Sequence, residues 1–268
     1  MNLRGLLASP LGFLIGLVMG ALGGGGAVLA VPALVYVAGQ TPKNATASAL
    51  LIVMCTAIGG LLAHSRDGNV QWGVGLAFGS GGVVGALLGS ALNTLVDDDV
   101  LLLAFSGLLL VVSASMFRQA RDPRFDREPG VVDDGDPVPH ALAGRPGKVA
   151  EVAALGIGVG VVTGFFGVGG GFIIVPVLMV VLKFPVHQAV GTSLLVISIN
   201  SLVSLIARQA WGSIEWSVAL PFTVAALLGV VTGNWLAKRV RSRVLIRAFA
   251  QLLIVIALYT ALDTALSM

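Results

Sequence analysis

Two glycine clusters are the residues of this chain whose type and spacing best suit chemistry. Residues 23–26 and 167–171 each interrupt an apolar run, and a proline follows each cluster, at Pro32 and at Pro176. Glycine disfavours helix by about 1 kcal/mol per residue relative to alanine, so we expect both helices to break there. The half-helix after a break begins with free backbone N–H groups, which bind anions. The glycines predicted to line this site are Gly24, Gly25, Gly26, Gly169, Gly170 and Gly171.

Small polar side chains in the apolar runs 45–63 and 189–207 would complete an anion site. They are Ser48, Thr56, Thr192, Ser193 and Asn200. Hydroxyl and amide groups donate hydrogen bonds without the full charge that would hold an anion too strongly to release it. Hydrogen bonding between helices is the alternative role for these side chains, as close helix packing is for the glycines.

No Asp, Glu, Lys or Arg lies deep in any predicted span. His64 follows the run 45–63, and Arg208 follows the run 189–207. Both are candidates for gating or for coupling transport to an ion. The alternative is that their side chains only reach the membrane surface. The chain contains no G-x-x-x-x-G-K-[ST] phosphate loop. It has three histidines, far apart in the sequence, and a single cysteine, Cys55. We therefore expect no ATP hydrolysis, no metal or other cofactor, and no enzyme activity.

The composition indicates an all-α integral membrane protein. Of the 268 residues, 56% are hydrophobic and only 11% are charged, which excludes a water-soluble globular domain. The net charge of +3 does not indicate nucleic-acid binding, because the charged residues lie between apolar runs. A spanning helix needs about 20 apolar residues. Such runs lie at 10–38, 45–63, 72–95, 100–117, 152–182, 189–207, 216–237 and 244–262.

The sequence repeats itself at an offset of 144 residues. Pro32 falls on Pro176 and Trp72 falls on Trp216, and many glycines match at the same offset. The prediction is a first transmembrane repeat at 1–117, a hydrophilic linker at 118–151, and a second transmembrane repeat at 152–268. Duplicated membrane halves are typical of transporters whose sites lie between the repeats, near the middle of the bilayer.

The distribution of basic residues favours inverted repeats. If every run spans once, the halves are parallel and the Lys and Arg residues divide 9 to 7 between the two sides. If 10–38 and 152–182 are instead re-entrant hairpins, each half has three spanning helices and the halves are inverted. With the N-terminus outside, 13 of the 16 basic residues lie inside, and only Arg4, Lys43 and Arg208 lie outside. We therefore predict inverted repeats with a cytoplasmic linker.

The order of motifs resembles the TauE/SafE family, also called the TSUP or sulfite exporter family. The second half contains Gly167-Val-Gly-Gly-Gly, then Pro176-Val-Leu, then Ala189-Val-Gly-Thr-Ser-Leu194. The first half departs from this pattern with Ala45-Thr-Ala-Ser-Ala-Leu50. The resemblance covers both halves and omits the linker. It implies a multi-pass carrier in the plasma (bacterial inner) membrane for small sulfur-containing anions such as sulfite, thiosulfate or organosulfonates, often in the export direction.

We therefore expect a secondary transporter that works by alternating access around the glycine-lined site between the repeats. An anion channel and a carrier of a different small organic anion are the alternatives. The expected partners are a small anionic substrate and membrane lipid, without nucleic acid, and a homo-oligomer is left open.

Overall fold

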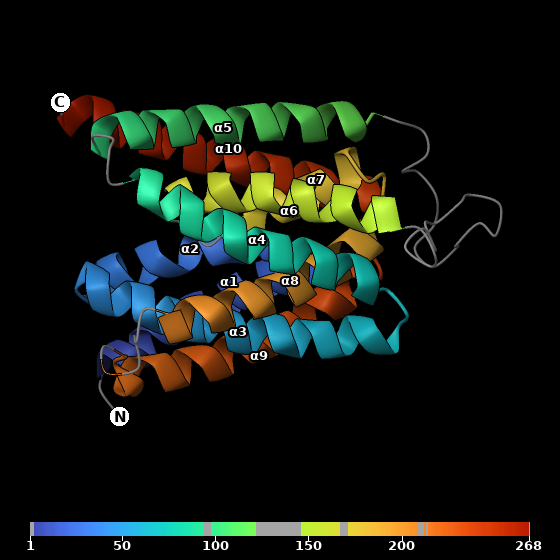
Figure 1. The fold of residues 1–268 in the computed structure, drawn as a ribbon. Coiled ribbons are helices and arrows are strands. Elements are labelled where there is room, and N and C mark those ends of the chain that lie inside the picture. The colour runs from blue at the N-terminus through green and yellow to red at the C-terminus, as the bar shows by residue number, and fades with distance from the viewer. Residues whose placement is uncertain are drawn as a thin grey trace.

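The regular structure of the computed structural model is entirely helical in the residues that it describes, which are 3–93, 98–121, 146–166, 171–207, 212 and 214–267 (Figure 1). The first half contains α1 (Leu3–Leu22), α2 (Ala27–Pro32), α3 (Pro42–Arg66), α4 (Trp72–Asn93) and α5 (Asp98–Gln119). The second half contains α6 (Pro146–Phe166), α7 (Gly171–Val180), α8 (Val186–Ala207), α9 (Trp216–Ala237) and α10 (Ser242–Ser267). The predicted all-α class is confirmed. Residues 122–145 of the predicted linker lie outside the described residues.

Five helices in the described part of the chain are long and apolar enough to cross a membrane: α3, α4, α8, α9 and α10. Shorter apolar stretches lie in α1, α5 and α6. The outward faces of the helices are apolar as well, with Leu228 60% exposed and Val231 63% exposed. Exposed apolar faces of this kind are stable against lipid and unstable in water. The chain is therefore a multi-pass membrane protein, as predicted.

The first apolar run is interrupted after α1. Gly23 follows α1 with a φ of +73°, a left-handed conformation that glycine adopts without a Cβ clash. The chain then forms a 3₁₀ turn, η1 (Gly24–Gly26), the short α2, and a π-helical turn, η2 (Ala33–Val37). Pro32, the last residue of α2, cannot donate a backbone hydrogen bond, and the wider turn follows directly after it. In the second half, α7 begins at Gly171, and residues 167–170 lie outside the described part.

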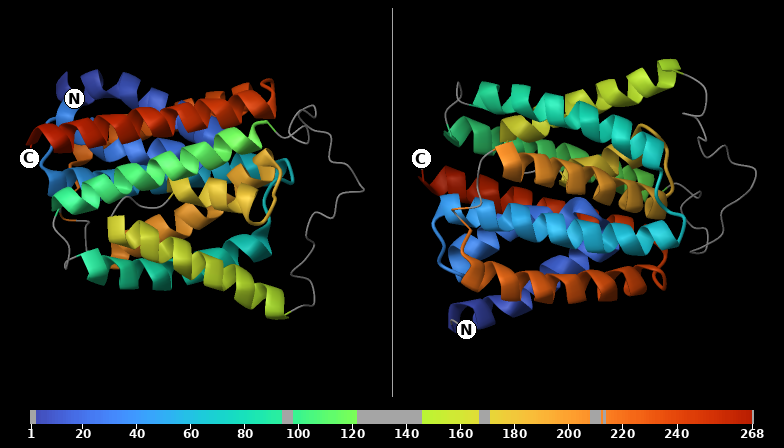
Figure 2. Two further views of the ribbon diagram at one scale, coloured as in Figure 1. Left: turned by 90° about the horizontal axis from the view of Figure 1, so that it is seen from above. Right: turned by 60° about the horizontal axis from the view of Figure 1, so that its bottom comes forward.

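Helices of the two halves correspond at the offset of 144 residues. The helices α3, α4 and α5 begin at residues 42, 72 and 98, and α8, α9 and α10 begin at 186, 216 and 242. Corresponding helices run in opposite directions: in Figure 1, α5 runs from left to right, and α10 runs from right to left towards the C-terminus. These two helices lie side by side, and the Ser113 hydroxyl of α5 donates a 3.0 Å hydrogen bond to the Ala250 carbonyl of α10. Figure 2 shows the same antiparallel pair from above.

Glycine rows join helices that belong to opposite halves. The most extensive helix contacts in the described residues are those of α1 with α9 and of α4 with α6. A Cβ added at Gly16 of α1 would overlap the Ala226 carbonyl of α9, and one added at Gly160 of α6 would overlap the Gly82 carbonyl of α4. Each first helix therefore packs backbone to backbone against a helix of the other half, as small residues permit in membranes.

Candidate functional site

The interruption after α1 contacts the start of α7. A Cβ added at Gly171 would lie 2.9 Å from the Gly24 carbonyl oxygen and 3.0 Å from the Gly24 Cα. One added at Gly24 would overlap the Gly171 backbone. Two predicted site glycines, one from each half, are thus in direct backbone contact. Gly25 lies in the same turn as Gly24, and Gly169 and Gly170 lie outside the described residues.

Ser193 of α8 lies beside this glycine contact. A Cβ added at Gly23 would lie 2.9 Å from the Ser193 Oγ and 3.0 Å from Cγ2 of Val175. The Ser193 hydroxyl donates a 2.8 Å hydrogen bond to the Val190 carbonyl of its own helix. Its oxygen can still accept a hydrogen bond, and its proton can turn to a ligand. Gly23 was not among the predicted site glycines; its left-handed φ is the feature that sets it apart from its neighbours.

Ser48 and Thr192 occupy equivalent positions of the two halves, and both side chains are fully buried. Their surroundings differ. The Thr192 hydroxyl accepts a 3.1 Å hydrogen bond from the Gln71 N–H, just before the start of α4. This bond ties α8 to the α3–α4 turn, which is the helix-linking role that the sequence left open for Thr192. The Ser48 hydroxyl has no hydrogen-bond partner in the described part of the chain.

Three other predicted residues lie against other helices. A Cβ added at Gly26 would lie 2.5 Å from the Ile15 carbonyl of α1. The Thr56 hydroxyl donates to the Ile52 carbonyl of its own helix at 2.7 Å and lies 3.3 Å from the Met19 sulfur of α1. The Asn200 side chain lies beside Gly82 of α4, and its amide oxygen has no partner among the described residues.

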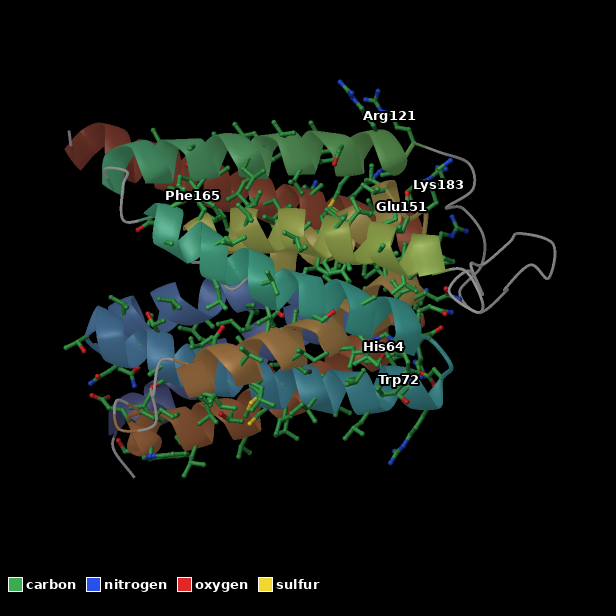
Figure 3. The ribbon with its side chains drawn as sticks, in the orientation of Figure 1. His64, Trp72, Arg121, Glu151, Phe165 and Lys183 are labelled. Atoms are coloured by element: carbon green, nitrogen blue, oxygen red, sulfur yellow. The ribbon has the colours of Figure 1, made fainter. Side chains whose placement is uncertain are left out.

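His64 is buried, with only 1% of its surface exposed. The alternative prediction, that the His64 ring reaches the membrane surface, is therefore wrong. The ring lies near the Gly20 backbone of α1, but neither ring nitrogen has a well-formed hydrogen bond within the described structure. Figure 3 places His64 at the end of the molecule that also carries Arg121 and Lys183. Arg208, its counterpart in the second half, lies outside the described residues.

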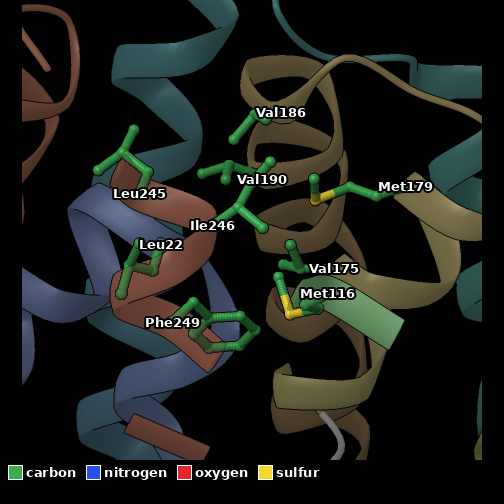
Figure 4. Close-up of a pocket in the computed structure, with 9 residues that line it drawn as sticks. All are labelled: Leu22, Met116, Val175, Met179, Val186, Val190, Leu245, Ile246 and Phe249. Atoms are coloured by element: carbon green, nitrogen blue, oxygen red, sulfur yellow. The ribbon is translucent and has the colours of Figure 1, made fainter. Parts of the chain in front are cut away.

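A small pocket with a volume of about 10 Å³ lies beside the end of α1 (Figure 4). Its lining is entirely apolar and consists of Leu22, Met116, Val175, Met179, Val186, Val190, Leu245, Ile246 and Phe249. Apolar walls offer an oxyanion no hydrogen bond, and burying an unpaired charge among them is strongly unfavourable. The glycine contact and Ser193 are therefore better candidates for an anion site than this pocket.

Comparison with known proteins gives the family. The family model described as "Sulfite exporter TauE/SafE" matches residues 8–260. A probable membrane transporter protein of Xylella fastidiosa (strain 9a5c) is 33% identical over 252 residues, which cover 92% of this chain and 91% of that protein. The probable membrane transporter protein YunE of Bacillus subtilis is 26% identical, over 94% of this chain and 93% of its own length. No solved structure gives a significant match. This chain is therefore a membrane transporter that belongs to the TauE/SafE family.

Proposed function

We propose that the protein is a secondary transporter that moves small sulfur-containing anions (sulfite, thiosulfate or organosulfonates) across the plasma (bacterial inner) membrane. The proposed site is the contact between the two halves at Gly24 and Gly171, completed by Ser193. The export direction in the family description is part of the same proposal. An inside-negative membrane potential of 100 mV favours outward movement of a monovalent anion by about 2.3 kcal/mol.

The observation that carries the proposal is the backbone contact between Gly24 and Gly171, with the Ser193 oxygen next to it. Here α7, a helix of ten residues, begins against the interruption that follows α1. The first turn of an α-helix has N–H groups without acceptors in that helix, and the helix dipole makes them attractive to an anion. Ser193 adds a hydroxyl to these groups. Such a set of neutral donors holds an oxyanion and can release it.

We further propose that residues 1–117 and 152–268 are inverted repeats joined by a cytoplasmic linker, and that 10–38 and 152–182 form re-entrant hairpins. The opposite directions of α5 and α10 support this topology. So does the position of Arg121 and Lys183 at one end of the molecule, because basic residues gather on the cytoplasmic side.

A reporter at the C-terminus tests this topology. Inverted repeats with an external N-terminus require an odd number of crossings per half, so a C-terminal fusion is expected outside and a fusion within the linker inside. Paired alkaline phosphatase and fluorescent protein fusions at residues 135 and 268 measure both positions. A C-terminus on the same side of the membrane as the linker would exclude the inverted arrangement.

Alternating access requires the two interruptions to separate, because the Gly24 and Gly171 backbones touch in this structure. Among the helices that the structure describes, the glycine-packed pairs α1–α9 and α4–α6 make the most extensive contacts, and each pair contains one helix from each half. We therefore propose that these mixed pairs move as units when the site opens to one side or the other.

Counterflow in proteoliposomes tests the function. We expect the wild type to exchange sulfite and methanesulfonate, and internal substrate to accelerate uptake, which distinguishes a carrier from a channel. Ser193→Ala is expected to lower this exchange by about 10-fold or more, because a hydrogen bond to a charged ligand contributes about 1.5–3 kcal/mol.

Ser115→Ala is the matched control. Like Ser193, Ser115 donates to the carbonyl three residues earlier in its own helix, Val112, at 2.6 Å, but it lies in α5, which contributes no residue to the proposed site. Exchange by this variant should equal that of the wild type. If Ser193→Ala also exchanges every sulfur anion at the wild-type rate, the proposed site is wrong.

A further inference from the structure

His64 joins helices of both halves at the end of the molecule that carries Arg121 and Lys183 (Figure 3). Its ring lies near the Gly20 backbone of α1. A Cβ added at Gly191 of α8 would lie 3.1 Å from the His64 Cβ. The histidine thus holds the end of α3 against α1 of its own half and against α8 of the other half.

The titratable and charged neighbours of His64 among the described residues come from three helix ends. They are His187 of α8, Asp67 after α3, and Lys238 after α9. His187 precedes Gly191 by four residues, so it lies on the face of α8 that packs against His64. Nζ of Lys238 and Oδ2 of Asp67 form an ion pair of 2.6 Å, which joins the end of α3 to the end of α9. Two histidine rings and one ion pair therefore lie together where α1, α3, α8 and α9 meet.

These helix ends also bury polar groups that have no partner among the described residues. Both ring nitrogens of His64 lack a well-formed hydrogen bond, and so does Nε2 of His187. Oε1 of Gln188, at the start of α8, and Oδ1 of Asn234, near the end of α9, are unpaired within the same part of the structure. Each of these groups would gain hydrogen bonds if water entered. The closed packing of the four helix ends is therefore opposed by the hydration of the groups that it covers.

A proton on His64 would strengthen this opposition. A buried imidazolium loses far more hydration than a buried neutral ring does. The charged ring would also repel Lys238, and it would repel His187 whenever His187 is protonated as well. Asp67 is already paired with Lys238 and offers only partial compensation. Protonation of His64 therefore favours a state in which the helix ends separate and water reaches the ring.

We propose that His64 is a proton-binding site that controls the opening of this end of the transporter. With the neutral ring, α1, α3, α8 and α9 stay packed as in this structure; with the protonated ring, they separate. In the proposed topology this end faces the cytoplasm, so acidification of the cytoplasm opens the carrier to the inside. The inference goes beyond the proposed function. Gly191 and Ser193 are two residues apart and lie on different faces of α8, so no anion takes part in the opening.

A cysteine one helical turn further inward measures this opening. Val230 of α9 is buried, and a Cβ added at Gly60, four residues before His64, would lie 3.3 Å from its Cγ1. Val230→Cys in a Cys55→Ser background therefore places the single cysteine where separation of α3 and α9 exposes it. The test measures its alkylation by N-ethylmaleimide in lipid nanodiscs without substrate. Division by the rate of Arg121→Cys, at an exposed position of the same end, removes the effect of pH on the thiol itself.

The relative alkylation rate is expected to increase at least about fivefold from about pH 7.5 to about pH 5.5, the range in which histidine changes its charge. Uptake of one proton sets an upper limit of about tenfold per pH unit. His64→Gln and His64→Asn keep a polar side chain without a titratable ring, so the rate in both should be independent of pH. His187→Gln is the matched control, because it removes the other histidine of this cluster and should keep the increase. A constant rate in the protein with His64 would overturn the inference, and so would an increase that persists in either His64 variant.

The outcomes separate this inference from the proposed function, because the alkylation test uses no substrate. Exchange of sulfur anions by a protein whose Val230→Cys rate is constant would overturn the role of His64 and leave the proposed function standing. Opening that depends on pH and on His64, in a protein that exchanges none of these anions, would overturn the proposed function and support the role of His64.

Discussion

Gly160→Leu is expected to lower the melting temperature of the detergent-solubilised protein by about 6 °C or more. Gly160 of α6 faces α4, and even a Cβ at this position would overlap the Gly82 carbonyl. Backbone atoms cannot turn aside as a side chain can, so α6 and α4 must move apart. Overpacking of this kind destabilises proteins by about 1–3 kcal/mol and sometimes more. In a chain of this size, each kcal/mol lowers the melting temperature by about 2–4 °C.

The matched variant is Gly158→Leu, on the same helix two residues earlier. No atom lies within 4 Å of a Cβ added at Gly158, so the leucine side chain would extend from an exposed position towards lipid. Its melting temperature should equal or slightly exceed that of the wild type, since leucine favours helix more than glycine does. Scanning fluorimetry with size-exclusion chromatography measures both variants. Equal melting temperatures would show that α4 and α6 do not pack through this glycine row.

The positions of the helices could be predicted well from the sequence. The run at 216–237 coincides with α9, and the run at 72–95 with α4, which ends at Asn93. Apolar length and the spacing of turn residues are local properties, so each run is readable by itself. Thr41 illustrates this, because its side chain accepts a hydrogen bond from the Asn44 N–H and so caps the start of α3. This helix cap involves only four consecutive residues.

Helix partners could not be predicted in the same way. The row Gly12, Gly16 and Gly20 indicates one close-packed face on α1, but any other small-residue face would fit it equally well. The structure pairs this row with α9 of the other half, through contacts such as that of Gly16 with Ala226. A row of glycines in the sequence predicts that two helices pack closely. Which helix packs against the row is seen only in the three-dimensional structure.

In the candidate site, too, the residue types could be predicted from the sequence but their contacts could not. The glycine clusters are visible in the sequence, whereas the contact of Gly24 with Gly171 joins residues 147 positions apart. Thr192 and Ser193 are neighbours of equal burial, yet only the structure shows that the Thr192 hydroxyl is bonded to Gln71. His64 was open to a surface interpretation because its position near a span end does not reveal which helices cover it. Burial depends on neighbours that are distant in the sequence.

Gly24→Ala is expected to abolish most transport while the protein stays folded. The added methyl group would overlap the Gly171 backbone, so the interruption after α1 and the start of α7 must shift relative to each other. Closely packed interiors transmit such a shift to adjacent groups, here Ser193 and the N–H groups of the first turn of α7. A displacement of about 1 Å weakens hydrogen bonds that depend on distance and angle. Counterflow of methanesulfonate should therefore fall at least about tenfold, the loss of one such bond to a charged ligand.

Gly12→Ala separates this effect from loss of stability. A Cβ at Gly12 would lie 2.8 Å from the Phe222 carbonyl oxygen of α9, so this variant also strains a backbone contact. This contact joins α1 to α9, and Gly12 precedes Gly23 by eleven residues in the sequence. The melting temperature of Gly12→Ala should fall, with exchange per folded molecule unchanged. Gly24→Ala overlaps backbone more closely than Gly12→Ala does, so its melting temperature should fall at least as much, and the loss of exchange per folded molecule is what distinguishes it. Gly12 lies in α1, and Gly24 lies in the turn that directly follows α1. Equal losses of exchange in the two variants would therefore mean that transport depends on the packing of α1 as a whole. The contact of Gly24 with Gly171 would then have no special part in binding the anion.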